Sequence, residues 1–74
     1  MKVFEVIQQR REQTGISVAE LSRRTGVKYE SLRTSLEGSR GITASELVFI
    51  SRELDLKIED FENIDPLFPE QEVA

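Results

Sequence analysis

The 74-residue sequence contains neither cysteine nor histidine. Without cysteine the chain has no disulfide framework and no thiolate metal site. Without histidine it lacks the usual general base and the commonest metal ligand. Its apolar runs are all shorter than the roughly 18 residues of a membrane-spanning helix. At the start of the chain Glu5 interrupts the apolar residues, and Arg10 and Arg11 follow, a pattern unlike that of a signal peptide.

These absences limit the classes of function. The acids show no spacing typical of a metal site, so a hydrolase or nuclease has almost no support. We therefore expect a cytoplasmic protein that is not an enzyme, needs no cofactor or metal and does not associate with a membrane. A chain of this length is one domain, and its stability should be modest because a small domain buries little surface.

The charges are unevenly distributed along the chain. The net charge is −4, yet residues 1–58 hold all ten Lys and Arg with only eight Asp and Glu. Residues 59–74 hold six acids and no base, together with Pro66 and Pro69. The first part can therefore present a locally basic face to a polyanion despite the acidic total. We divide the chain into a domain at residues 1–62 and an acidic, proline-containing tail at residues 63–74, expected to be extended or disordered.

Hydrophobic spacing and capping signals predict an all-α, compact bundle of about five short helices. The expected segments are residues 2–14 before Gly15, a helix that Ser17 opens and Gly26 closes, residues 28–37 before Gly38, a helix that Thr43 opens, and a short turn at 56–61. Ser17 with Glu20, and Thr43 with Glu46, have the spacing of capping boxes. The expected core is Phe4, Ile7, Leu21, Val27, Leu32, Leu47, Ile50 and Leu54.

The stretch from Val18 to Leu36 is the most informative. Only Gly26 and Val27 separate its two short helices, so these must cross steeply, with Leu21, Ser22, Val27 and Leu32 at the crossing. The outer face of the second helix then protrudes. It carries Lys28, Tyr29, Glu30, Ser31, Arg33 and Thr34. A helix with such a surface fits the major groove of DNA and can read base edges there.

The ordered set of residues along this stretch resembles the lambda-repressor-like (Cro/XRE-type) helix-turn-helix family over residues 3–61. The residues that carry the resemblance are Arg11, Gly15-Ile16-Ser17, Glu20-Leu21-Ser22, Gly26-Val27, Leu32, Gly38, Leu47, Ile50, Leu54 and Leu56. The resemblance implies a sequence-specific transcriptional regulator, such as a phage- or plasmid-type repressor. It implies binding to double-stranded DNA, usually as a homodimer, with the recognition helix at about 28–37 in the major groove.

The resemblance also implies which residues would contact DNA. Tyr29, Glu30, Ser31 and Thr34 would face the bases, while Ser17, Val18, Lys28, Ser39 and Arg40 would lie along the phosphates, with Arg11 near them. Arg33 could read guanine bidentately. The sequence departs from the family at three of its positions: Val18 replaces a Gln that touches phosphate, Ser35 replaces an apolar packing residue, and Lys28 replaces a Ser or Thr cap. Leu36 is expected to take the place of Ser35 in the core.

Several of these residues also have a structural interpretation. Tyr29 could shield the turn. Arg33 could pair with Glu30 or Glu37, and we favour this ion pair over a contact with guanine. Arg11 could form an ion pair with Glu37 instead of meeting a phosphate. We expect Arg23 and Arg24 to be solvated.

A second hypothesis is an adaptor or antirepressor of the same fold that no longer binds DNA. The acidic total, Val18 and the apolar side chains of the tail favour it. Those side chains are Ile64, Leu67, Phe68 and Val73. They are either unstructured or part of a dimer interface or protein-docking site, because large apolar groups otherwise stay in water. The short fifth helix and the tail are the expected dimer surface.

Overall fold

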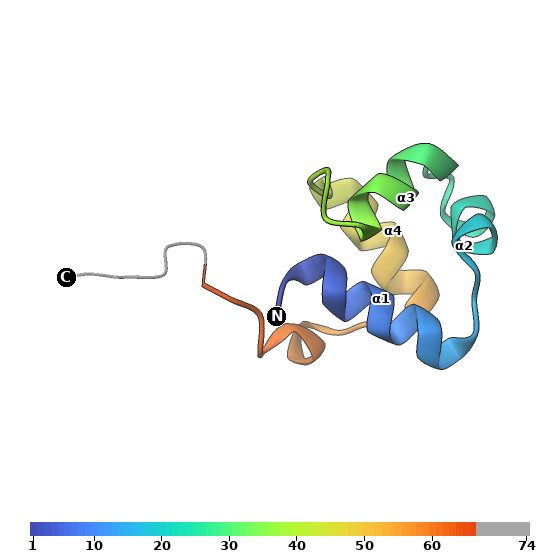
Figure 1. The fold of residues 1–74 in the computed structure, drawn as a ribbon. Helices are drawn as coiled ribbons and strands as arrows, with labels where there is room; N and C mark the ends of the chain where they lie inside the picture. Colours follow the sequence, from blue (N-terminus) through green and yellow to red (C-terminus); the bar gives the residue numbers. More distant parts are fainter. Residues whose placement is uncertain (67–74) are drawn as a thin grey trace.

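The computed structural model describes residues 1–66, which form four α-helices and one 3-10 helix (Figure 1). The elements are α1 (Val3–Thr14), α2 (Val18–Thr25), α3 (Tyr29–Leu36), α4 (Ala44–Leu54) and η1 (Ile58–Phe61). These residues contain no strand, and the all-α fold class is confirmed. Helix α1 packs on α3, α4 and η1, while α2 packs on α3 and α4. No helix within this part of the chain is long and apolar enough to cross a membrane.

Side-chain caps fix where α2 and α4 begin. The Ser17 hydroxyl accepts from the Glu20 N–H at 3.0 Å, and the Thr43 hydroxyl accepts from the Glu46 N–H at 3.1 Å. At Thr43 the box is complete, because the Glu46 carboxylate also accepts from the Thr43 N–H at 3.1 Å. At Ser17 the predicted capping box is wrong in one of its two contacts. The Glu20 carboxylate does not accept from the Ser17 N–H, because it accepts from Arg23 and Arg24 instead.

The buried core lies between the four helices. It consists of Val6, Ile7, Leu21, Leu32, Leu36, Ile50, Leu54 and Leu56. Burying each such side chain contributes about 1.5–3 kcal/mol. Leu36 is in the core as expected, but it does not replace Ser35, because Ser35 is also buried at 2 % exposure. Phe4, Val27 and Leu47 are only partly buried, contrary to the predicted core, because they lie at the edge of the bundle and keep one side in solvent.

Arg10 ties the carboxyl end of α4 to α1. Its guanidinium donates to the carbonyls of Leu54 at 2.7 Å and Asp55 at 3.0 Å, and it pairs with Asp60 at 3.1 Å. A cation suits this position, since the last carbonyls of a helix lack intrahelical partners. Asp55 adopts a left-handed conformation (φ 54°), which aspartate tolerates better than most residues, and this turns the chain into η1.

The segment after η1 packs back on the start of the chain. The Asp65 N–H donates to the Met1 carbonyl at 2.7 Å, and the Met1 ammonium pairs with the Asp65 carboxylate at 2.9 Å. Ile64 is partly buried against the core. The packed part of the chain therefore reaches Asp65, beyond residue 62, where composition placed the boundary. Leu67, Phe68 and Val73 lie outside the described residues.

Gly38 ends α3 under the ring of Phe4. Its φ is +85°, and a Cβ built on it would lie 2.8 Å from Phe4 Cζ. Gly26 has a similar φ of +81°, but a Cβ there would meet nothing within 4 Å. The two glycines therefore share a conformational constraint and differ in steric contact.

We predict that Gly38→Ala destabilises the domain more than Gly26→Ala. Gly26→Ala should lower the free energy of unfolding by about 1–2 kcal/mol through its φ alone. Gly38→Ala should cost a further ~1–3 kcal/mol because the ring must move. Urea denaturation of both variants measures the difference, and a Phe4→Leu background should reduce it. Equal losses in the two variants would contradict the proposed contact.

Candidate nucleic-acid interface

Helices α2 and α3 form a tight, internally bonded pair. Leu21 and Leu32 are fully buried at their crossing. The Ser22 hydroxyl donates to the Val27 carbonyl at 2.6 Å. The Thr25 hydroxyl donates to the Leu21 carbonyl at 2.8 Å and accepts from the Val27 N–H at 3.3 Å. These bonds satisfy the backbone of the turn, so the angle of α3 is fixed by the turn and by the core. Of the residues predicted at the crossing, Leu21 and Leu32 are in the common core, and the Ser22 side chain is bonded to the Val27 backbone.

Helix α3 lies at the outer edge of the bundle (Figure 1). Tyr29 and Glu30 on its polar face are exposed. Lys28 occupies its N-cap without a side-chain cap bond, so the first N–H groups of α3 receive no acceptor from that side chain. Tyr29 is 46 % exposed, and Glu30 is also exposed. Ser31 and Thr34 are partly buried, and the Thr34 hydroxyl donates to the carbonyls of Glu30 and Ser31 at 2.9 and 3.1 Å. The residues expected to face the bases thus share one solvent-facing surface.

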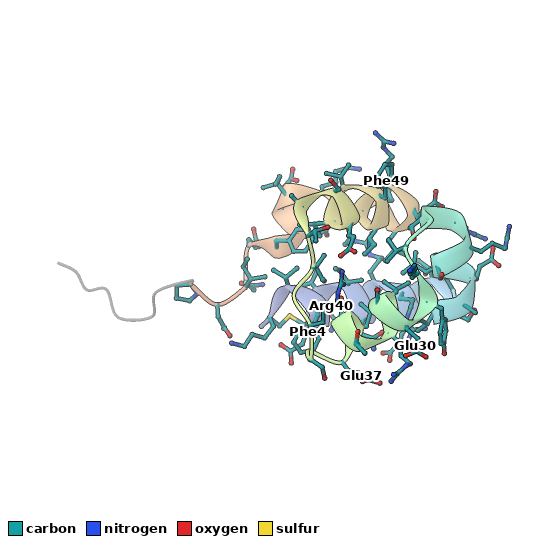
Figure 2. All side chains as sticks on the ribbon, turned by 90° about the horizontal axis from the view of Figure 1, so that it is seen from above. Phe4, Glu30, Glu37, Arg40 and Phe49 are labelled. Carbon is teal, nitrogen blue, oxygen red and sulfur yellow. The ribbon has the colours of Figure 1, made fainter. Side chains whose placement is uncertain are left out.

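Arg33 is held between an acid of its own helix and the acid that caps the carboxyl end of that helix. Its guanidinium pairs with Glu30 at 2.8 Å and with Glu37 at 2.7 Å, and Figure 2 labels both acids. The hydrogen bond and charge of Glu30, followed by the charge of Glu37, raise the pKa of Arg33. The predicted intrahelical ion pair is confirmed. Because all three side chains remain largely in water, the pairs contribute little stability and can open when a ligand arrives.

Arg11 has a structural role, but with partners that the sequence did not indicate. It donates to the Ile16 carbonyl and to the Gln8 side chain, both at 2.8 Å, and its side chain is mostly buried. It therefore braces the loop between α1 and α2. The alternative ion pair with Glu37 is wrong, because Glu37 is engaged by Arg33 and the nearer Ile16 carbonyl takes the Arg11 guanidinium.

Arg40 joins the loop after α3 to α4 (Figure 2). Its guanidinium donates to the Ser35 hydroxyl at 2.5 Å and pairs with Glu46 at 2.8 Å. It also reaches the Ser31 carbonyl at 3.4 Å. Ser35 is 2 % exposed, and its buried hydroxyl is satisfied because it accepts from Arg40 and donates to the Gly41 carbonyl at 3.4 Å. The unusual serine at this core position is thereby explained.

The Ser35–Arg40–Glu46 cluster was not predicted, although a serine in an apolar position five residues before an arginine was a usable signal. The hydrogen bond from Arg40 lowers the pKa of Glu46, more than burial raises it. The same contact raises the pKa of Arg40. The cluster therefore works as a charged brace between the carboxyl end of α3 and the first turn of α4.

The remaining predicted phosphate contacts lie at two places. Ser17 caps α2, and its neighbour Val18 is partly buried against the core. Ser39 is exposed in the loop that also carries Arg40.

Within residues 1–66 every base but two has an ion-pair partner; Lys28 and Arg52 have none. Arg52 lies over the Phe49 ring at 5.5 Å, and Lys28 stands at the start of α3. The same part of the chain holds no cluster of acids suited to a metal ion.

A hydrogen-bonded α2–turn–α3 pair that presents an exposed polar helix defines a helix-turn-helix domain. The family model of the Cro/C1-type HTH DNA-binding domain matches residues 6–66. The chain belongs to this family, and the resemblance seen in the sequence is confirmed. Comparisons with curated proteins and with solved structures find no match.

The brace around Arg40 leads to a prediction on acid stability. Since the pKa of Glu46 is lowered from 4.5 in the folded state, its ion pair stabilises the fold above pH 4.5. That contribution is lost as the pH falls through the lower, folded-state pKa. Arg40→Ala should lower the melting temperature at neutral pH and make it less sensitive to acid below pH 4.5. Thermal unfolding by circular dichroism at several pH values measures both effects. Wild type and variant losing stability in parallel on acidification would argue against the brace.

Proposed function

We propose that this protein is a cytoplasmic, sequence-specific DNA-binding regulator of transcription, of the repressor type, that acts as a homodimer. The observation that carries the proposal is the exposed polar face of α3, held at a fixed angle by the turn at residues 26–28. In such a protein α3 enters the major groove and reads base edges. The absence of cysteine and histidine supports the cytoplasmic, non-enzymatic part of the proposal.

Lys28 is the base best placed to contact a phosphate. It stands at the amino end of α3, where the unbonded N–H groups and the helix dipole also favour an anion. No acid within the described residues neutralises it. Arg40, by contrast, must leave Ser35 and Glu46 to reach a phosphate, and Arg11 must leave Ile16.

We predict that Lys28→Ala weakens binding to every duplex sequence and lowers the salt dependence of binding. One phosphate contact contributes about 0.9 to the slope of log K against log salt, and the variant should lose that amount per copy. Arg23→Ala is the matched control, since it removes the same charge from the exposed surface of α2. Fluorescence anisotropy with random-sequence duplex DNA at several salt concentrations gives both slopes. A slope reduced equally by the two substitutions would refute the phosphate contact.

Glu30 is the residue best placed to read a base by accepting a hydrogen bond. It lies in the first turn of α3, and Arg33 holds one of its carboxylate oxygens. A carboxylate accepts from the cytosine amino group, and the adjacent guanidinium offsets its repulsion by phosphate. We infer that Glu30 and Arg33 act together at one position of the operator.

We predict that Glu30→Gln changes the preferred base at that position from cytosine to adenine, because glutamine pairs bidentately with adenine. The change should be worth about 1–3 kcal/mol of discrimination between the two bases. Glu37→Gln is the control: it removes the other acid on Arg33, yet should alter the affinity without altering the preferred base. Selection from a randomised duplex library reads out the preference, and the same preferred base in all three proteins would count against a contact by Glu30.

A second candidate function, the adaptor that binds another regulator and no DNA, is favoured by one observation. Most bases of the described residues are already paired with acids, and α3 with its two cap residues is neutral, since Lys28 and Arg33 are balanced by Glu30 and Glu37. DNA binding must weaken steeply with salt because it releases counterions. Absence of binding to random-sequence DNA at low salt would therefore favour the adaptor.

A further inference from the structure

Helix α4 exposes two large apolar side chains next to each other. Val48 is 52 % exposed and Phe49 is 46 % exposed. A hollow of about 370 Å³ lies beside Phe49, between the first half of α4 and the turn that joins α2 to α3. Val27 and Phe49 form its apolar lining. Single exposed apolar side chains are ordinary, but two neighbours at the edge of a hollow form a small interaction surface.

Both basic side chains that lack an ion-pair partner within residues 1–66 belong to this surface. Lys28 lines the same hollow as Phe49, and the Arg52 guanidinium lies over the Phe49 ring at 5.5 Å from its centre. The hollow is also lined by Ser31 and Ser45, which offer two hydroxyl groups. An exposed aromatic ring with two free cations beside it favours a ligand that combines apolar groups with negative charge.

The nearby acids do not oppose such a ligand. Glu46 lines the hollow, but its carboxylate is held by Arg40 at 2.8 Å. Glu53 is exposed on α4 and does not line the hollow. In Figure 2, Phe49 lies at one edge of the bundle, and Glu30 and Glu37 lie at the opposite edge. The acids of the recognition helix are therefore directed away from this surface.

We propose that the surface formed by Lys28, Phe49, Arg52 and the adjoining hollow binds an acidic segment of a partner protein. An aromatic or large aliphatic side chain of the segment enters the hollow against Phe49, and carboxylates on either side of it pair with Lys28 and Arg52. Aromatic and arginine side chains are enriched in protein interfaces. DNA would satisfy the two cations but would leave the exposed apolar side chains in water.

Binding of this segment excludes DNA, because Lys28 is also the proposed phosphate contact. The partner therefore acts as an antagonist that releases the regulator from its operator. This consequence rests on the proposed function, whereas the binding itself needs no DNA.

Fluorescence anisotropy of the full chain with a labelled synthetic peptide tests the surface. The peptide carries one phenylalanine between two pairs of glutamates, and a second peptide has serine instead of the phenylalanine. We expect the first peptide to bind, and the second to bind about tenfold more weakly or worse, because its apolar anchor is missing. Phe49→Ser should weaken binding of the first peptide by a similar factor. Arg52→Ala should weaken it about two- to fivefold, as for an exposed ion pair.

Each variant has a matched control. Ile58→Ser removes an apolar side chain that is 86 % exposed but does not line the hollow, and it should leave the Kd of the peptide unchanged. Arg23→Ala removes an exposed charge from α2 and should also have no effect. Circular dichroism checks that all four variants are folded.

Three results would overturn the proposal. They are a first peptide that does not bind at high micromolar protein, equal losses for Phe49→Ser and Ile58→Ser, and a loss of DNA affinity in Phe49→Ser and Arg52→Ala as large as their loss of peptide affinity. The third result would assign the surface to DNA.

Competition separates this proposal from the proposed function. Unlabelled first peptide should release labelled duplex DNA from the wild type, and Phe49→Ser should need about tenfold more peptide while binding DNA normally. A chain that binds the peptide but no DNA keeps the surface and removes the regulator. A DNA complex that the peptide leaves intact would refute the antagonism.

Discussion

The rest of the structure depends on the tight turn between α2 and α3. Three residues connect the helices, so the chain turns sharply from α2 into α3, which requires Gly26 in its left-handed conformation and partners nearby for the turn's polar groups. Ser22 and Thr25 provide those partners from within α2. Leu21 and Leu32 then meet at the crossing and enter the common core. The angle at which α3 leaves the bundle is therefore set locally, and the other elements have only to support it.

Arginines supply much of that support, which limits their use elsewhere. Arg10 holds the end of α4, Arg11 the loop before α2, and Arg40 the loop before α4. Each guanidinium satisfies a backbone carbonyl, and a planar group with five donors can do so while also pairing with an acid. In a domain this small the apolar core is limited, and hydrogen-bonded braces at the loops add stability that the core cannot supply. The consequence is that a count of basic residues overstates how many are available to DNA.

The sequence predicted the elements well because their signals are local. Helix periodicity, the box at Thr43 and the glycines at the helix ends involve residues within one turn of each other, and Ile7, Leu21, Leu32, Ile50 and Leu54 are in the core as expected. The partners of Arg10 and Arg40 could not be predicted in this way, because Leu54 and Asp60 approach Arg10 only after α1 and α4 have packed. The predicted capping contact of Glu20 was wrong for a different reason, because two arginines on the same helix bind the carboxylate that the cap would use. Among the candidate site residues, the composition of the α3 surface was predicted correctly, whereas the braces around it depend on tertiary packing.

The small number of unpaired bases near α3 has a consequence for DNA recognition. Affinity for arbitrary DNA comes almost entirely from phosphate contacts, so a motif whose main available base is Lys28 should bind non-specific DNA weakly. In the proposed function, contacts to base edges would not be weakened in this way, since they would come from hydroxyls, Tyr29 and the Glu30–Arg33 pair. The ratio of specific to non-specific affinity, which decides occupancy in a genome, can therefore be high even when the absolute affinity of one copy is low. A second copy bound to the same operator then raises the total affinity without adding free charge, because its binding becomes intramolecular. In the proposed regulator, binding of a second copy would thus be the physical means by which a nearly neutral recognition surface holds DNA.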